Sequence, residues 1–163
     1  YSFPPCSPPH SLTKMIRISF SEGYSLNDRS IKYCSGETGI YLIYLTSSAI
    51  NYPIKPCKLV YIGMSESAHN SMGRRLRDHL SGQSGNVGIS NYAKYSHTSF
   101  TYHTFEVLKH CGTNNLFDIE SLFLDSFLKA YGCFPLCNGQ SGHEIVDEST
   151  KAVELEIDWS FCE

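Results

Sequence analysis

Five polar side chains combine a capacity for chemistry with informative positions in the sequence: Tyr41, Tyr61, Arg75, His79 and Glu120. Two phenols, a guanidinium, an imidazole and a carboxyl group can together bind an anion and move a proton. The spacing predicts a helix over 72–80, in which Arg75 and His79, four residues apart, stack along one edge of an apolar stripe. At that margin Arg75 can reach a ligand held over a neighbouring sheet. The alternative is that Arg75 is one more solvated charge on a surface helix.

The carboxyl group of Glu120 lies in a predicted helix from Leu116 to Tyr131. With about 100° between successive residues, the apolar side chains fill one broad arc, and Glu120 falls in the middle of it. A lone ionised carboxylate there would cost roughly several kcal/mol unless it were paired, protonated or bound to a metal ion. Two explanations stay open at this point, an ion pair with Arg75 or Lys109 and a metal site.

Three short segments are predicted to be β-strands: Gly39–Thr46, Lys58–Ser65 and Ser99–Leu108. They are rich in β-branched and aromatic residues and are bounded by turn formers. The first two are joined by a stretch of Ser, Asn and Pro that suits an irregular hairpin, so they are expected to be antiparallel neighbours. Tyr41 and Tyr61 then lie on adjacent strands.

The tripeptides Gly39-Ile40-Tyr41 and Tyr61-Ile62-Gly63, followed by Arg75 four residues before His79, resemble the GIY-YIG nuclease superfamily. That superfamily includes homing endonucleases, the incising subunit of bacterial excision repair, structure-specific nucleases and some restriction enzymes. Its pattern continues with a glutamate on a later helix and an asparagine beyond that helix. This chain offers Glu120 and Asn138 at those places, so the resemblance spans roughly residues 36–139.

The resemblance implies an α/β fold with a small central sheet of three mixed or antiparallel strands, flanked by helices. It implies metal-dependent hydrolysis of a DNA phosphodiester, with Tyr61 as general base, helped or replaced by Tyr41. Arg75 would hold the scissile phosphate, and Glu120 would bind one Mg²⁺ or Mn²⁺ ion. His79 would orient a tyrosine or the attacking water, and the asparagine would hold the site together near the metal-binding glutamate.

The sequence departs from the family pattern after the second tripeptide, where many members carry a lysine. This chain has Met64, Ser65 and Glu66 there, and Arg74 is the substitute on offer. Together with the net charge of −3, the departure keeps open a second function, a catalytically weak or inactive DNA-binding scaffold. A third is an interaction domain that does not bind nucleic acid and uses its aromatic and acidic ends.

Further contacts with DNA are predicted on two segments. Arg74 and Arg77 project from the polar face of the predicted helix over 72–80, where they can meet phosphates. The long polar stretch over 81–97 adds four stacking or phosphate-binding candidates: Tyr92, Lys94, Tyr95 and His97. An equally weighted alternative for this stretch is a short helix that packs its tyrosines on the core.

The length of 163 residues fits one domain with additions at both ends. The nuclease-like part is expected over residues 36–140, preceded by an N-terminal extension over 1–35 and followed by an acidic extension over 141–163. The alternating patterns at Lys14–Phe20 and Val153–Ile157 predict extra strands, whereas Ser21–Gly36 is predicted to be a loop.

The seven cysteines form no CxxC pair, which favours reduced, mostly buried thiols in a cytoplasmic protein over a zinc site or disulfides. No apolar run is long enough to cross a bilayer, so no membrane partner is expected. DNA is the expected partner. A homodimer is a further expectation, because one small site must otherwise cut two strands in succession.

Overall fold

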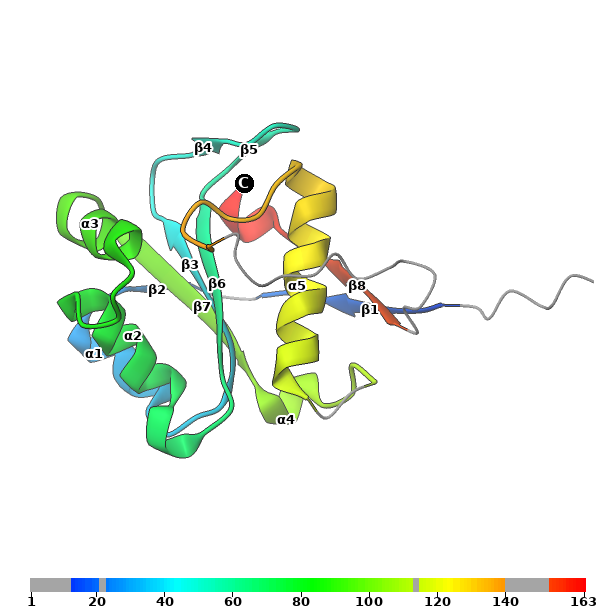
Figure 1. Cartoon of the computed structure of the whole chain (residues 1–163), viewed down its shortest axis with the longest axis horizontal. Helices are drawn as coiled ribbons and strands as arrows, with labels where there is room; N and C mark the ends of the chain where they lie inside the picture. Colours follow the sequence, from blue (N-terminus) through cyan, green and yellow to red (C-terminus); the bar gives the residue numbers. More distant parts are fainter. Residues whose placement is uncertain (1–12, 21–22, 113–114, 140–152) are drawn as a thin grey trace, which may run out of the picture.

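A computed structural model describes residues 13–20, 23–112, 115–139 and 153–163. Helices cover both faces of a central sheet (Figure 1), which confirms the predicted α/β class. The sheet has the order β2-β7-β3-β6 and consists of four strands: β2 Tyr24–Ser25, β7 Thr98–Thr104, β3 Gly39–Leu45 and β6 Leu59–Ser65. The three long strands are the predicted ones, and the short β2 is an addition. All neighbouring strands in this sheet are antiparallel.

The connection between β3 and β6 carries a small antiparallel pair, β4 (Ile50–Asn51) with β5 (Pro56–Cys57), as expected for an irregular hairpin loop. The strand β7 ends earlier than predicted, at Thr104, and the chain continues as helix α4 (Phe105–Leu108). The Phe105 backbone N–H donates to the Thr38 carbonyl at 2.8 Å, the last bond in register with the β3–β7 pair before the chain turns into α4.

Alternation along the strands sorts side chains into two cores. Ile40, Leu42 and Ile62 face α5 (Leu116–Tyr131), where Ile119, Phe123 and Phe127 meet them. Tyr41, Ile43 and Val60 face the other way, toward α2 (Met72–Ser81) and α3 (Val87–Tyr95). Since β6 is an edge strand, α2 and α5 flank that edge from opposite faces of the sheet (Figure 1).

The segment 23–36 is more structured than the loop predicted for it. It forms β2, then helix α1 (Asp28–Ile31) and the 3-10 turn η1 (Lys32–Cys34). The Asn27 side chain accepts the Ser30 backbone N–H at 2.9 Å and so caps α1. Ile31 and Cys34 are wholly buried against α2, so burial of apolar side chains outweighs the local turn preference.

Strands form at both ends of the described chain, as predicted, but they pair with each other. β1 (Lys14–Ile18) and β8 (Val153–Ile157) make a separate two-stranded parallel sheet. Their inward side chains join the core beneath α5, and the chain then turns through η4 (Ser160–Cys162). The described parts of both predicted extensions, residues 13–20, 23–35 and 153–163, therefore pack on the central part of the chain.

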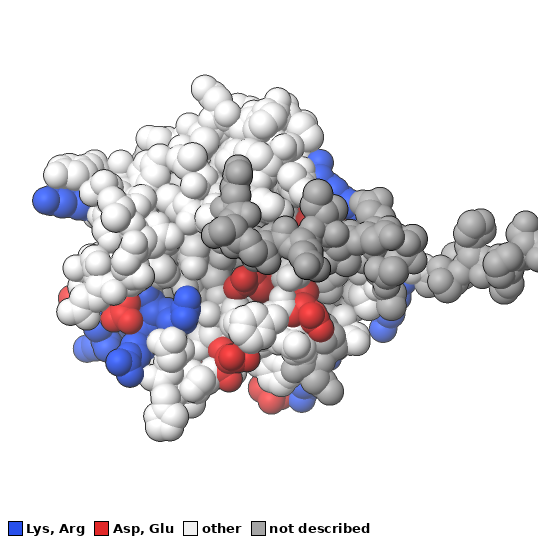
Figure 2. All heavy atoms as spheres, viewed as in Figure 1, with Lys and Arg blue, Asp and Glu red and all other residues white. Residues whose placement is uncertain are grey.

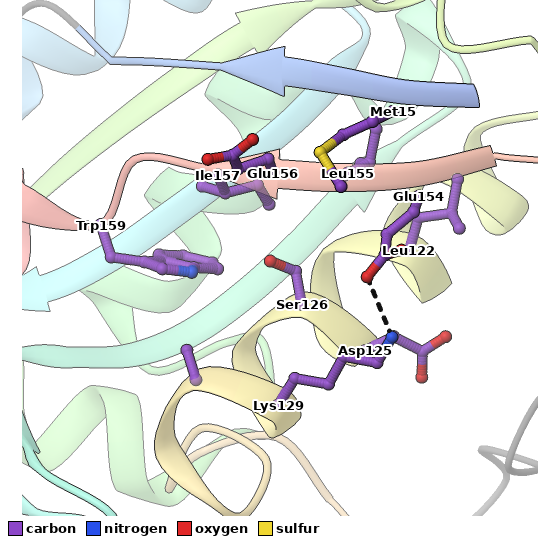
Figure 3. Close-up of a pocket in the computed structure, with 11 residues that line it drawn as sticks. Met15, Leu122, Asp125, Ser126, Lys129, Glu154, Leu155, Glu156, Ile157 and Trp159 are labelled. Carbon is purple, nitrogen blue, oxygen red and sulfur yellow. Dashed lines mark hydrogen bonds and ion pairs between the residues drawn. The ribbon is translucent and has the colours of Figure 1, made fainter. Parts of the chain in front are cut away.

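Figure 3 shows the junction of α5 and β8, a cavity of about 280 Å³ with an apolar wall that includes Leu122 and Trp159. At its rim Lys129 Nζ lies 3.1 Å from Glu154 Oε1. None of the residues predicted to act in chemistry lines this cavity. In the parts of the chain that the structure describes, no helix has the length and apolar character needed to span a bilayer.

The polar stretch after α2 contains a helix, as its second interpretation predicted, but only Tyr92 packs on the core, because Tyr95 is exposed. α2 ends at Gly82, whose φ of 85° is the left-handed conformation that glycine adopts without strain. A turn follows, and Asn86 caps α3 by accepting the Ile89 backbone N–H at 3.2 Å. Ile89 is buried, and Tyr92 packs against the same core.

Candidate active site

A polar cavity of about 300 Å³ opens beside the β6 edge. It is lined by Tyr61, Asn70, Arg75, Asp78, His79, Gln83, Ser84 and Asn86. These residues come from β6, the turn before α2, α2 itself and the turn that leads into α3. Three of the residues predicted from the sequence, Tyr61, Arg75 and His79, therefore meet in one place.

The register of β3 and β6 explains why Tyr41 and Tyr61 lie together. Gly63 is directly opposite Tyr41, and Tyr61 is opposite Ile43, so both phenols are on the α2 face of the sheet. Their ring centroids are 6.0 Å apart. A Cβ atom on Gly63 would overlap both the Tyr41 phenol and the Tyr61 ring. The glycine therefore leaves the space through which the Tyr41 hydroxyl reaches the site.

Gly63→Ala is expected to lower the free energy of unfolding by about 1–3 kcal/mol, because the new methyl group must push aside a wholly buried phenol. The displaced Tyr41 hydroxyl would also lose its partners. Thermal unfolding followed by circular dichroism measures the effect. An unchanged midpoint would show that the two phenols do not lie across this glycine.

A chain of hydrogen bonds runs from Arg75 through the buried Tyr41 to two residues that line the cavity, His79 and Ser84. Arg75 Nε donates to the Tyr41 hydroxyl at 3.2 Å, and the same hydroxyl lies 3.0 Å from His79 Nε2. The other ring nitrogen of His79, Nδ1, lies 2.8 Å from Ser84 Oγ. Tyr41 is wholly buried and His79 nearly so. His79 therefore contacts Tyr41 directly, as its predicted role of orienting a tyrosine requires.

The two phenols differ in access to the cavity. Burial raises the pKa of Tyr41 far above its usual range, and the neighbouring Tyr61 adds to the rise, while the charge of Arg75 opposes it. Burial also raises the pKa of Tyr61, and the charge of Arg75 and the contact with Tyr41 oppose this rise without cancelling it. Tyr61 lines the cavity and Tyr41 does not. The expectation that Tyr41 can replace Tyr61 as a base is not supported, because its hydroxyl is sealed from substrate.

Arg75 is half-buried between the phenols and the cavity. Burial alone lowers its pKa, but the contacts with Tyr41 and Tyr61 outweigh burial and leave the pKa raised. The guanidinium therefore stays charged at every pH of interest. The interpretation of Arg75 as a solvated surface charge is wrong, since it is hydrogen-bonded to Tyr41 and half-buried.

Glu120, on α5, does not line this cavity but lies close enough to Tyr61 and Arg75 to act on them electrostatically. Its carboxyl group is half-buried, and burial raises its pKa to about 7, with the charge of Arg75 acting in the opposite direction. The charge of Glu120 in turn raises the pKa of Tyr61. Figure 2 shows this face, with basic side chains over α2 and acidic side chains over α5. Arg75 therefore acts electrostatically on Tyr41, Tyr61 and Glu120, which lie on three different elements around the β6 edge.

Neither predicted ion pair of Glu120 forms within the described residues: it pairs with neither Arg75 nor Lys109, whose Nζ lies 2.7 Å from Glu106. Among those residues no group of three or more His, Cys, Asp and Glu side chains gathers either. Mg²⁺ suits a site of this kind, because it keeps several waters and takes one or two protein carboxylates with substrate phosphates. A half-buried carboxyl group without an ion-pair partner in the described chain fits one such ligand.

Asn138 is bonded to the backbone of β6, next to Tyr61. Its amide Nδ2 donates to the Ile62 carbonyl at 2.8 Å, and its Oδ1 accepts the Ile62 backbone N–H at 3.0 Å. Next to it, the Cys137 N–H donates to the Val60 carbonyl at 2.8 Å. Asn138 thus pairs with the exposed edge of β6 in place of another strand, and it positions that strand without facing the cavity.

The predicted DNA contacts on helices lie outside the cavity. Arg74 and Arg77 are exposed on α2, and Arg74 Nη1 donates to the His69 carbonyl at 3.1 Å. On α3, Tyr92 is half-buried, whereas Lys94, Tyr95 and His97 are exposed around the end of the helix that lies away from the cavity. These four were expected to act together, but the helix turns Tyr92 away from the other three.

The sequence did not single out the residues of the turn between α2 and α3. Ser84 contacts His79, and Asn86 both caps α3 and donates from Nδ2 to the Cys137 carbonyl at 2.9 Å. The pattern Gly82-Gln83-Ser84-Gly85 indicates a turn. It does not indicate that the turn folds back on α2, which depends on the Ser84 N–H donating to the Asp78 carbonyl at 3.1 Å.

The lowered pKa of His79 predicts that the protein loses stability in acid. Burial lowers its pKa from 6.5 to about 4, and the charge of Arg75 adds to the fall. Between these two pH values His79 binds fewer protons in the folded state than in the unfolded state. The free energy of unfolding is therefore highest above about pH 6.5 and falls as the pH decreases toward 4. His79→Gln should remove roughly 1–3 kcal/mol of this dependence in urea unfolding curves. The exposed His110→Gln serves as control, and an equal change in both variants would contradict the assignment.

No protein-family model matches this chain, and neither does any curated protein or solved structure. The function must therefore be argued from the chemistry of the site. It joins a charged guanidinium, a cavity-facing phenol with a buried hydrogen-bond partner, and a carboxyl group without an ion-pair partner in the described residues. Such a set can hold a phosphate, accept a proton from water and bind one divalent cation.

Proposed function

We propose that this protein is a metal-dependent DNA endonuclease of the GIY-YIG type, which its two tripeptides resemble. The observation that carries the proposal is that Tyr61 and Arg75 line one polar cavity while the carboxyl group of Glu120, on a third element, is close enough to act on both electrostatically. A purely structural cluster would leave Glu120 paired with the nearby arginine. The function also accounts for the polar cavity beside these groups.

Arg75 holds the scissile phosphate in this proposal. Its Nε is engaged by Tyr41, which fixes the plane of the guanidinium. The remaining N–H groups can donate to two phosphate oxygens, the planar geometry that arginine offers and lysine does not. The phosphate is thereby oriented with one face toward the cavity, where water has access.

Tyr61 takes the proton from the attacking water. A phenol is a poor base at neutral pH unless its anion is stabilised by nearby positive charge. Burial and the charge of Glu120 leave the pKa of Tyr61 raised, while Arg75 and the contact with Tyr41 oppose the rise. The base role therefore requires the phenolate to be stabilised further by the divalent cation that Glu120 would hold. Glu120 would hold Mg²⁺ or Mn²⁺. A divalent cation at that carboxylate, when bound, compensates charge on the nonbridging oxygens and on the leaving 3′ oxygen.

A second candidate is a DNA-binding scaffold without turnover. The net charge of −3 and the absence of lysine at residues 64–66 favour it. Supercoiled plasmid incubated with protein and Mg²⁺ separates the two: the nuclease yields nicked or linear DNA that EDTA prevents. A gel shift in Ca²⁺ without cleavage in Mg²⁺ or Mn²⁺ would instead support the scaffold.

Two further features belong to this proposal. One cavity per chain cuts one strand at a time, so linear product formed without a nicked intermediate would indicate a homodimer on the DNA. The described cysteines are all free thiols, which supports a reducing, cytoplasmic compartment.

A further inference from the structure

The sulfur atoms of Cys57 and Cys162 meet in the core, although the two residues are 105 positions apart in the sequence. Cys57 Sγ lies 3.4 Å from Cys162 Sγ, and both side chains are wholly buried. Cys57 ends β5, and Cys162 ends η4. In the part of the chain that the structure describes, no other two cysteine sulfurs are in contact. Neither of the two lines the polar cavity of the candidate site.

Backbone contacts already hold the two segments close enough for a covalent bond between these sulfurs. The N–H of Lys58, the residue after Cys57, donates to the Cys162 carbonyl at 2.6 Å. Next along the chain, Glu163 Oε1 accepts the Tyr131 hydroxyl hydrogen at 2.6 Å. A disulfide bond needs a sulfur–sulfur distance of about 2.0 Å. Rotation of the two side chains supplies the remaining movement, so the backbone can keep its hydrogen bonds.

The two thiols differ in their readiness to ionise. The contact with Cys162 lowers the pKa of Cys57 to about 7, although burial opposes the fall. The same contact, together with burial, raises the pKa of Cys162. The Leu59 N–H donates to Cys57 Sγ at 3.4 Å, which also favours the thiolate. Burial instead raises the pKa of Cys34 and of Cys111. Since the thiolate is the nucleophile in disulfide exchange, Cys57 is the attacking group.

We propose that Cys57 and Cys162 form a reversible disulfide bond when the protein meets a disulfide oxidant such as oxidised glutathione. The Cys57 thiolate attacks one sulfur of the oxidant, and the first glutathione leaves. Cys162 then loses its proton and attacks the Cys57 sulfur, and the second glutathione leaves. Two electrons pass from the cysteines to the oxidant, and the two cysteine protons end on the two glutathione thiols.

The bond is expected to act on stability. It closes a loop that contains β6, α2 and α5, the elements that carry the candidate site. A cross-link over a long loop removes conformational freedom mainly from the unfolded state. Oxidation should therefore stabilise the fold without changing the site. The inference is independent of the proposed nuclease activity, and DNA cleavage enters none of its tests.

Peptide mapping tests the bond in the wild-type chain. Because both sulfurs are buried, the protein is unfolded in urea and refolded in equal concentrations of reduced and oxidised glutathione, and free thiols are then alkylated. The refolded chain should lack two hydrogen atoms, and one pair of peptides should be joined through Cys57 and Cys162. Dithiothreitol should restore both thiols. Free thiols or glutathione adducts at these two positions, or a bond from either one to a different cysteine, would overturn the proposal.

Thermal unfolding supplies the second readout. The oxidised protein should unfold about 5–15 °C above the protein reduced with dithiothreitol. This difference should vanish in Cys162→Ser and persist in Cys111→Ser. Cys111 is the matched control because it is wholly buried and touches no other described sulfur. Equal midpoints for oxidised and reduced wild-type protein would contradict the proposed stabilisation. The peptide map uses the wild-type chain alone, so it decides the question even where a variant fails to fold.

Discussion

Glu120→Gln will abolish metal-dependent cleavage and at the same time stabilise the protein at pH 8. Glutamine keeps the shape of the side chain but is a poor ligand for Mg²⁺, which prefers carboxylates. The gain in stability comes from removing a charge that burial disfavours, since the pKa of Glu120 is raised from 4.5 to about 7. A residue that lost activity merely by unfolding would change both properties in the same direction.

The pH dependence of the free energy of unfolding explains why Glu120→Gln is expected to gain stability. The folded state holds a proton on Glu120 that the unfolded state has released, so wild-type stability falls as the pH rises from about 4.5 through 7. Urea unfolding should show roughly 1–3 kcal/mol of this loss in the wild-type protein and little in Glu120→Gln. Glu106→Gln is the control, because Glu106 is exposed and pairs with Lys109. A marked loss of stability in Glu120→Gln would reveal a structural ion pair and contradict the metal site.

Tyr61→Phe will reduce cleavage by about 10²- to 10⁴-fold while leaving DNA affinity unchanged. Only the hydroxyl group that takes the proton is lost, whereas Arg75 still binds phosphate. Rates of plasmid nicking under single-turnover conditions and gel shifts in Ca²⁺ measure the two effects. Tyr33→Phe, in a tyrosine 58% exposed in η1, should change neither.

Tyr41→Phe provides a contrast at the neighbouring phenol. It leaves Arg75 Nε and His79 Nε2 without their partner in a buried place, so a stability loss of about 1–3 kcal/mol is expected along with lower activity. Tyr61→Phe should be nearly as stable as the wild-type protein. If Tyr61→Phe cuts at the wild-type rate, Tyr61 is not the base.

The sequence predicted what short-range patterns control. Alternation in β3 and β6, with glycines and turn residues at their ends, placed Tyr41 and Tyr61 on adjacent strands. Helical periodicity located Arg75 and His79 on one edge of α2 and revealed Glu120 as a carboxyl group within an apolar arc. These residues form the candidate site, and their positions follow from strand alternation and helical periodicity.

Other features depend on contacts between distant segments, which no local pattern encodes. The pairing of β1 with β8 joins the two ends of the chain, and α1 forms because Ile31 is buried against α2. The pairing of the Asn138 amide with the free backbone edge of β6 likewise depends on a contact between segments 76 residues apart. Ser84 escaped notice because its partner, His79, is reached only when the turn folds back.

A crystal of the protein soaked with Mn²⁺ and a short DNA duplex tests the central claim most directly. The account predicts the ion at about 2.1 Å from one carboxylate oxygen of Glu120. It also predicts a phosphate bonded to Arg75, with a water between that phosphate and the Tyr61 hydroxyl. Ion and phosphate bound elsewhere, or Glu120 turned onto a cationic side chain with no ion beside it, would contradict it.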